Sequence, residues 1–252
     1  MTEVTGTDTA STIKTAIQDI LKTIDQERER EIITRRFGLF DRKETLEQIG
    51  ELLGITRERV RQLEKAIIIR LKIATEEGNI PAVRTIERLI IRDLSENGRI
   101  GRVNDIAERL SPGKATAIRT HVAFIAELSP RLTTINETDN YYQGISIAEN
   151  GDEKKVRSDV DIVLKAIKIR SNIDTIVKTI KKHGEPIDIE TLHGMLTYES
   201  PAQVRALASL SKQLASLKDV WGLTKWPTVN PKNIRDKIYV ILVGNGKPLH
   251  FS

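Results

Sequence analysis

Cysteine is absent from the 252 residues of the chain. Its absence excludes disulfides, zinc sites built on thiolates and cysteine nucleophiles, and it fits a reducing compartment. No stretch approaches the roughly twenty consecutive apolar residues that a membrane-spanning helix needs. Residues 1–10 also lack the basic start and apolar core of a signal peptide. We therefore expect a cytoplasmic protein that does not associate with a membrane.

Patterns that indicate catalysis are missing as well. The sequence has no glycine-rich phosphate loop, no nucleophile elbow and no histidines at paired metal-ligand spacing. Its four histidines are isolated, at positions 121, 183, 193 and 250. Isolated histidines are usually exposed or have their hydrogen bonds satisfied in a core. We therefore expect neither an enzyme nor a bound metal, cofactor or small-molecule substrate.

Basic residues outnumber acidic ones only slightly. Forty lysines and arginines against 35 aspartates and glutamates give a formal charge of +5 and a pI near 9.3. This excess is compatible with nucleic acid, but affinity for a phosphate backbone depends on the local density of basic side chains. A nucleic-acid interface must therefore be sought as a local cluster.

Residues 44–66 predict a helix-turn-helix. Thr45 and Gln48 have the spacing of a capping box, and Gly54 supplies the left-handed backbone that ends a helix. A second helix is predicted to start at Thr56. The apolar residues of both helices recur at helical spacing: Leu46, Ile49, Leu52 and Leu53 in the first, and Val60, Leu63, Ile67 and Leu71 in the second.

The outer face of the second helix carries side chains that can recognise bases. Arginine can donate two hydrogen bonds to guanine, glutamine can bond adenine in the same way, and glutamate can accept from the cytosine amino group. Recognition helices enter the major groove by their N-terminal end, where these residue types are crowded here. The candidate DNA-binding residues are Thr56, Arg57, Glu58, Arg59, Arg61, Gln62 and Lys65.

A solvated helix is the alternative interpretation of the same face. Glu58 and Gln62 stand at the i,i+4 spacing at which side chains interact on a helix, whereas Arg61 and Lys65 do not make such a pair. Charge pattern alone does not exclude this alternative. The capping box, the turn glycine and the order of the helices favour the helix-turn-helix.

These residues resemble the fourth conserved region of housekeeping-type bacterial sigma factors, over roughly residues 25–76. Residues 29–39, 45–50 and 56–66 are similar to that family's preceding, supporting and recognition helices. The resemblance implies that Arg57, Glu58 and Gln62 read bases of the upstream promoter element and that Arg61 contacts the backbone or a base edge. It also implies two partners, double-stranded promoter-like DNA and the flap of the RNA polymerase β subunit.

Sigma factors also carry an aromatic-rich region that melts the promoter, because unpaired bases stack on aromatic faces. Here only about 25 residues precede the match, aromatic residues make up 4% of the chain, and most of them follow residue 120. We therefore do not expect a complete sigma factor that starts transcription by itself.

Polar stretches divide the chain into predicted segments. These are a disordered tail at residues 1–11, the helix-turn-helix domain at 12–80, a winged-helix-like domain at 82–148, a second winged-helix domain at 159–230 and the start of a truncated further repeat at 231–252. Residues 78–81 and 149–158 have the polar composition of boundaries. Few core contacts are expected across them, so residues 1–80 and 159–230 are expected to fold alone.

The winged-helix prediction comes from a repeated order of elements. A helix, a short extended piece, two helices and a hairpin follow one another twice, and this is the winged-helix order. The predicted third helices are residues 115–128 and 202–217. The second copy resembles the HARE-type winged-helix family, which includes the RNA polymerase delta subunit, in its turn at Gly184 and its end at residues 221–226. The fold class is therefore predicted to be mainly α, with small β wings.

The third helices carry few polar or basic side chains: Lys114, Arg119 and His121 in one, and Gln203, Arg205 and Lys212 in the other. A protein contact or a spacer is favoured over DNA reading there, because lone basic residues on a helix are usually solvated. Trp221 and Trp226 are interpreted as core anchors, since large aromatic side chains chiefly supply buried area.

Together these features predict a bacterial-type, nucleoid-associated transcription protein. Its helix-turn-helix would read promoter-like DNA and contact RNA polymerase. The alternative is a scaffold protein that binds polymerase without recognising a DNA sequence. Salt-dependent, sequence-selective DNA binding distinguishes the two.

Overall fold

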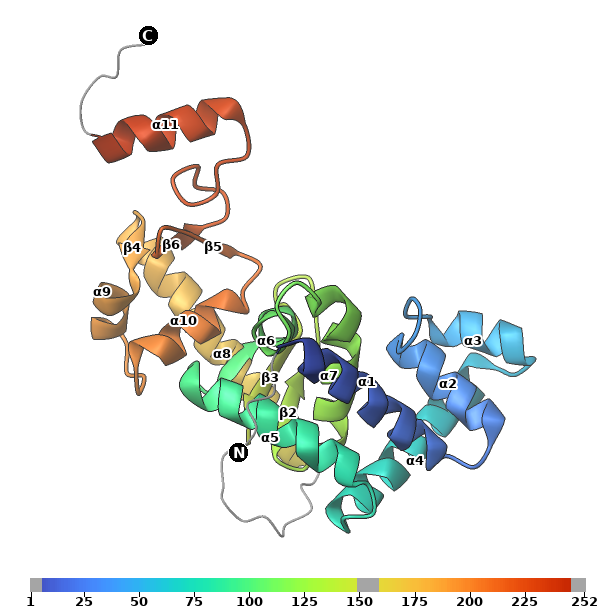
Figure 1. The fold of residues 1–252 in the computed structure, drawn as a ribbon. Helices are drawn as coiled ribbons and strands as arrows, with labels where there is room; N and C mark the ends of the chain where they lie inside the picture. Colours follow the sequence, from blue (N-terminus) through green and yellow to red (C-terminus); the bar gives the residue numbers. More distant parts are fainter. Residues whose placement is uncertain (1–5, 149–158, 246–252) are drawn as a thin grey trace. The chain divides into compact units, whose positions relative to one another are not determined.

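The computed structural model describes residues 6–148 and 159–245, and these are mainly helical, as the sequence predicts (Figure 1). The described elements are α1 (Gly6–Lys22), α2 (Glu27–Phe37), α3 (Leu46–Leu53), α4 (Arg57–Glu76), α5 (Pro81–Glu96), β1 (Ile100–Arg102), α6 (Val103–Leu110), α7 (Ala115–Leu128), β2 (Leu132–Ile135), β3 (Gly144–Ile147), α8 (Asp159–His183), β4 (Ile187–Asp188), α9 (Ile189–Gly194), α10 (Pro201–Ser209), β5 (Leu214–Leu217), β6 (Val220–Leu223) and α11 (Ile234–Asn245). None of these helices is long and apolar enough to cross a membrane.

The helix-turn-helix forms where it is predicted. The Thr45 hydroxyl accepts a hydrogen bond from the backbone N–H of Gln48, and the Gln48 side chain accepts one from the N–H of Thr45, so the capping box at the start of α3 is confirmed. Gly54 ends α3 with a φ of 65°, in the left-handed region that glycine adopts freely. Thr56 caps α4 by accepting a hydrogen bond from the N–H of Arg59 at 3.2 Å.

A small apolar core holds α2, α3 and α4 together. Its centre is Ile32, Ile49 and Val60, one fully buried side chain from each helix. Leu52 is 54% exposed, so its assignment to the buried stripe of the first predicted helix is wrong. The buried stripe of α3 is narrower than the predicted apolar stripe, because a helix of eight residues has few side chains that face its neighbours.

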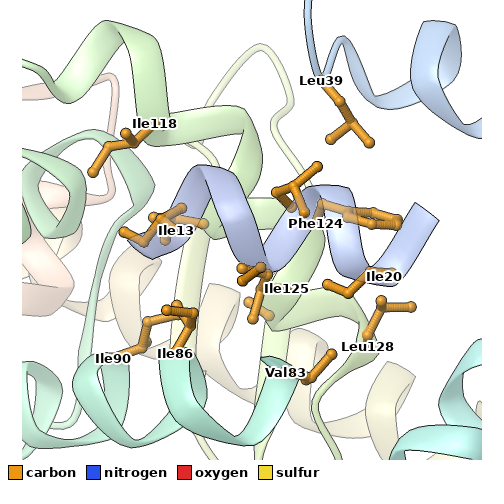
Figure 2. Packing of buried hydrophobic residues seen from close by; sticks show 14 of the residues in the cluster. Ile13, Ile20, Leu39, Val83, Ile86, Ile90, Ile118, Phe124, Ile125 and Leu128 are labelled. Carbon is orange, nitrogen blue, oxygen red and sulfur yellow. The ribbon is translucent and has the colours of Figure 1, made fainter. Parts of the chain in front are cut away.

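A larger core lies in the first of two compact units, which comprises Met1–Glu96, Val103–Thr134 and Ile145–Ile162. Figure 2 shows side chains of α1, α5 and α7, such as Ile13, Ile86 and Ile125, gathered in one cluster. Ile67 and Leu71, from the second half of α4, belong to the same cluster. The Phe37 and Phe124 rings lie 4.8 Å apart, and His121 of α7 hydrogen-bonds the carbonyl of Leu39.

The expectation that few core contacts cross residues 78–81 is therefore wrong. Ile80 within the predicted boundary and Val83 just after it are both buried, and α4 packs against α5 and α7. A polar sequence at a helix junction indicates a turn, but it does not show that the two helices have separate cores. The helix-turn-helix and the following helices share one.

The second unit comprises Asn97–Arg102, Ile135–Gly144 and Val163–Ser252. The loop between β2 and β3 is bonded to the segment before β5, since the N–H of Tyr142 donates to Leu210 and the N–H of Lys212 donates to Asn140, each at 2.8 Å. Ile100 and Ile135 share a core with the buried side of α8. The core around α8 thus includes side chains from outside residues 159–230, and whether those residues fold alone stays a prediction.

Two segments of the chain have the same succession of elements. The order α5, β1, α6, α7, β2, β3 repeats as α8, β4, α9, α10, β5, β6, and in each sheet the last strand is central, giving β1-β3-β2 and β4-β6-β5. In the second sheet both pairings are antiparallel, with Leu214 opposite Leu223 and Ile187 opposite Trp221.

Two predicted boundaries are wrong. The third helix predicted at residues 202–217 ends at Ser209, and Leu214–Leu217 is a strand. The predicted disordered tail extends too far, because α1 begins at Gly6 and Thr9 is buried. The predicted linker at residues 149–158 and the end of the predicted truncated repeat, 246–252, lie outside the described residues.

Candidate nucleic-acid interface

The turn between α3 and α4 is tight because Gly50 lies directly against it. A Cβ atom on Gly50 would stand 2.7 Å from the carbonyl oxygen of Ile55, closer than such atoms approach. Arg28 of α2 adds a hydrogen bond to the carbonyl of Leu53 at 2.7 Å. The start of α4 is therefore fixed relative to the two helices that precede it.

The first turns of α4 separate apolar from polar side chains. Val60 and Ile67 are buried, while all seven predicted DNA-binding residues are exposed: Thr56, Arg57, Glu58, Arg59, Arg61, Gln62 and Lys65. The structure thus brings these residues together on one accessible face. A helix N-terminus that projects such a face is the geometry by which recognition helices enter a major groove.

Glu58 is the centre of a hydrogen-bond network on this face. Nε and Nη2 of Arg61 donate to its two carboxylate oxygens at 2.8 and 2.7 Å, and Gln62 donates to it at 3.2 Å. The hydrogen bonds from Arg61, followed by that from Gln62, lower the pKa of Glu58 to about 2. The carboxylate is therefore ionised at neutral pH, which is the state that can accept from a cytosine amino group.

Arg57 has its partner on the other helix. Its Nη1 lies 2.8 Å from Oε1 of Glu47, in the first turn of α3. Glu47 and Gly50 were missed as site residues by the sequence interpretation, because neither spacing nor residue type indicates a contact across the turn. The capping box at Thr45 was the one signal that located the start of α3, and hence Glu47, beside the start of α4.

The solvated-helix alternative remains compatible with these contacts. The pair of Glu58 with Gln62 that it requires is present, as is an ion pair of Glu58 with Arg61. Exposed pairs of this kind contribute little to stability, so they do not prevent the same side chains from turning to another partner. Helix order and the tight turn remain the features that favour DNA reading.

The third helices of the two repeated segments pack on one side against elements of their own units, while Lys114, Arg119 and Arg205 stay exposed. In the first unit, α1 and α4 pack against α7, and His121 is buried, so it is not available to a partner on the surface of this helix. In the second unit, α10 packs against β1, and a Cβ atom on Gly98 would stand 2.5 Å from the carbonyl oxygen of Ala202. Trp221 is buried and Trp226 packs on the same core, as the core-anchor interpretation predicts.

Comparison with known proteins identifies the helix-turn-helix. Residues 26–72 match the family model for Sigma-70, region 4. This segment is a Sigma-70 region 4 domain. It includes α2, α3 and the first sixteen residues of the twenty in α4.

Curated relatives match the same part of the chain. The RNA polymerase sigma factor SigA from Bacillus sp is 43% identical over 61 residues, which are 24% of this chain and 16% of that protein. The RNA polymerase sigma factor sigB from Arabidopsis thaliana is 47% identical over 58 residues, 22% of this chain and 10% of that protein. The matched part thus spans less than a fifth of either relative. No solved structure shows significant similarity to the chain.

Proposed function

We propose that the protein is a DNA-binding transcription factor of sigma-factor-like type, which reads promoter-like duplex DNA through α4 and contacts RNA polymerase. One observation carries the proposal: within a Sigma-70 region 4 domain, the exposed face of α4 gathers Arg57, Glu58, Arg61 and Gln62 while the opposite face is buried. These are the residue types that distinguish base pairs in the major groove.

The roles we assign follow from hydrogen-bonding capacity. Arg57 would donate to guanine, Gln62 would bond adenine, Glu58 would accept from cytosine, and Arg61 would contact the backbone or a base edge. Lys65, one turn further along α4, would contact phosphate and so fix the register of the helix without selecting a sequence.

RNA polymerase is the protein partner we propose, and the flap of its β subunit is the docking site. Both relatives are named RNA polymerase sigma factors, which supports a polymerase-associated role. We place the protein in the cytoplasm, at the nucleoid.

The two repeated segments are proposed to be winged-helix modules of the HARE type. Their common order of elements and their common strand order support this assignment. Because α7 and α10 pack against neighbouring elements of their own units and carry only a few scattered basic side chains, we assign these modules to protein contact or spacing rather than to groove reading.

A selection of bound sequences from random duplex DNA, using the full chain, tests the proposal. We expect enrichment of one short sequence, with an affinity for it that falls steeply with salt. A polymerase-binding scaffold is the second candidate, favoured by the internal partners that Arg57 and Arg61 already have. Retention of core polymerase together with equal affinity for all duplexes would establish the scaffold and refute DNA reading.

A further inference from the structure

We infer that Glu47 is a positioning residue that sets the base preference of Arg57. The inference rests on the proposed DNA reading by α4 and adds a specificity determinant outside that helix. The observation that supports it is the ion pair between Oε1 of Glu47 and Nη1 of Arg57, which are 2.8 Å apart. This pair joins the first turn of α3 to the first turn of α4.

The atoms used by this pair leave Arg57 able to read a base. A guanidinium group has five N–H donors, so a contact at Nη1 leaves Nε and Nη2 for two parallel hydrogen bonds to guanine. Arg61 is arranged in the opposite way, since its Nε and Nη2 are the atoms that donate to Glu58. Arg57 is therefore the arginine whose bidentate edge is not occupied by its acidic partner.

Glu47 is itself held by a fixed element. It lies between Thr45 and Gln48, the two residues of the capping box, and Gly50 brings α3 close to the turn. An unrestrained arginine loses considerable side-chain entropy when it binds, up to about 2 kcal/mol. A carboxylate on a rigid helix removes part of that loss by limiting the orientations of the guanidinium before DNA arrives.

The pair orients Arg57 in the free protein but contributes little to its stability, and we expect a larger contribution at the interface. The side chains of Arg57 and Glu47 are 68% and 52% exposed, so solvent screens their attraction. A base pair that covers Arg57 displaces this water, and the attraction between the two charges strengthens in the lower local dielectric. The contribution of Glu47 therefore concerns discrimination among sequences rather than folding.

The test compares Glu47→Ala with Glu51→Ala, which removes an equal charge from an exposed position on the same helix. The base position read by Arg57 is first located as the one at which Arg57→Ala loses discrimination. There we expect Glu47→Ala to reduce discrimination by about five- to tenfold, an ordinary size for coupling between contacting residues, while other positions keep their preference. Glu51→Ala is expected to raise affinity for all duplexes alike.

Two further variants make the outcome decisive. In an Arg57→Ala background, Glu47→Ala is expected to change no preference. Glu47→Gln, which keeps the shape and one hydrogen-bond acceptor, is expected to lose discrimination to a smaller extent. It replaces Glu47→Ala in the measurement if the alanine variant does not fold. Unchanged discrimination in Glu47→Ala, or an equal loss with and without Arg57, overturns the inference but leaves DNA reading intact. A wild-type chain without any base preference overturns both.

Discussion

The carboxylate of Glu58 accepts hydrogen bonds from two of the residues that we propose to read DNA. Arg61 and Gln62 therefore have to leave Glu58, or share it, when they meet a base. The exchange costs little because all three side chains are solvated in the free protein. It does make their contributions interdependent, so substitutions at these three positions are not expected to be additive.

Arg57 and Lys65 differ in what they are expected to contact, and alanine substitution separates them. Arg57→Ala should weaken binding to the preferred duplex by about 1–3 kcal/mol and relax the preference at one base position, as loss of a bidentate contact does. Lys65→Ala should weaken all sequences alike and reduce the salt slope by about one. Titrations of preferred and scrambled duplexes at several salt concentrations measure both effects. Equal losses on both duplexes for Arg57→Ala would contradict base reading by that residue.

His121 of α7, which bonds Leu39 of the region 4 domain, is expected to make the stability of the first unit depend on pH. Its Nε2 bonds the Leu39 carbonyl, so the neutral ring carries its proton there, and Nδ1 is buried without a hydrogen-bond partner in the described structure. Burial lowers the pKa of His121, partly offset by the bond to Leu39, and the nearby charge of Lys14 lowers it further. A second proton would have to enter this buried site.

Because the folded pKa of His121 lies below the unfolded value of about 6.5, its stabilising contribution is present above that pH. The contribution is lost as pH falls through the folded pKa. We expect the urea midpoint of the wild-type chain to decline between pH 7.5 and pH 5. His121→Gln keeps a donor for Leu39 and does not titrate, so its decline should be shallower. Equal declines in the two proteins would assign the pH dependence to other groups.

Local sequence rules located the helices of the site well. Thr45, Gln48 and Gly54 make their contacts with backbone groups only a few residues away. Their spacing alone therefore predicts both ends of α3. The contact of Glu47 with Arg57 could not be predicted in this way, because it depends on the angle between two helices. That angle follows from Gly50 and from packing around Ile49 and Val60.

Strand β5 was missed for a related reason. It is joined to β6 by Lys218 and Asp219, whose φ angles of 51° and 63° are both positive. Such turns usually contain asparagine and glycine, and without them the apolar spacing of residues 202–217 indicated a continuous helix. The hairpin forms because pairing of Leu214 with Leu223 and of Leu217 with Val220 outweighs an unfavourable turn.

The double substitution Lys218→Asn and Asp219→Gly should therefore stabilise the second unit. We expect a gain of about 0.5–1 kcal/mol, since both new residues adopt positive φ at lower cost. Urea unfolding followed by the fluorescence of Trp221 and Trp226 measures it, because both tryptophans belong to this unit. Lys225→Asn, at an exposed position without positive φ, is the control and should have almost no effect. A destabilised double variant would show that the present turn contributes contacts of its own.

The larger error of the sequence interpretation concerned which helices share a core. Periodicity correctly marked Ile13, Ile17 and Ile20 as a buried stripe, but a stripe does not show what covers it. In the structure α1 packs on α5, α6 and α7, which follow the helix-turn-helix in the chain. The region 4 domain is thus continued by helices that pack against the second half of α4.

Removing those helices should disable the domain. A fragment of residues 1–80 loses the partners of Ile13, Ile17, Ile20, Ile67 and Leu71. At about 1.5–3 kcal/mol for each large apolar side chain, the loss is comparable with the roughly 5–15 kcal/mol that stabilises a typical domain. We expect the amides of residues 67–75 to exchange slowly in the full chain and fast in this fragment, with weaker DNA binding. A fragment of residues 1–162 keeps the whole first unit and should retain slow exchange there. If residues 1–80 protect these amides as well as the longer fragment does, the small core around Ile32, Ile49 and Val60 suffices to hold α4, and the shared core is not required for the proposed DNA reading.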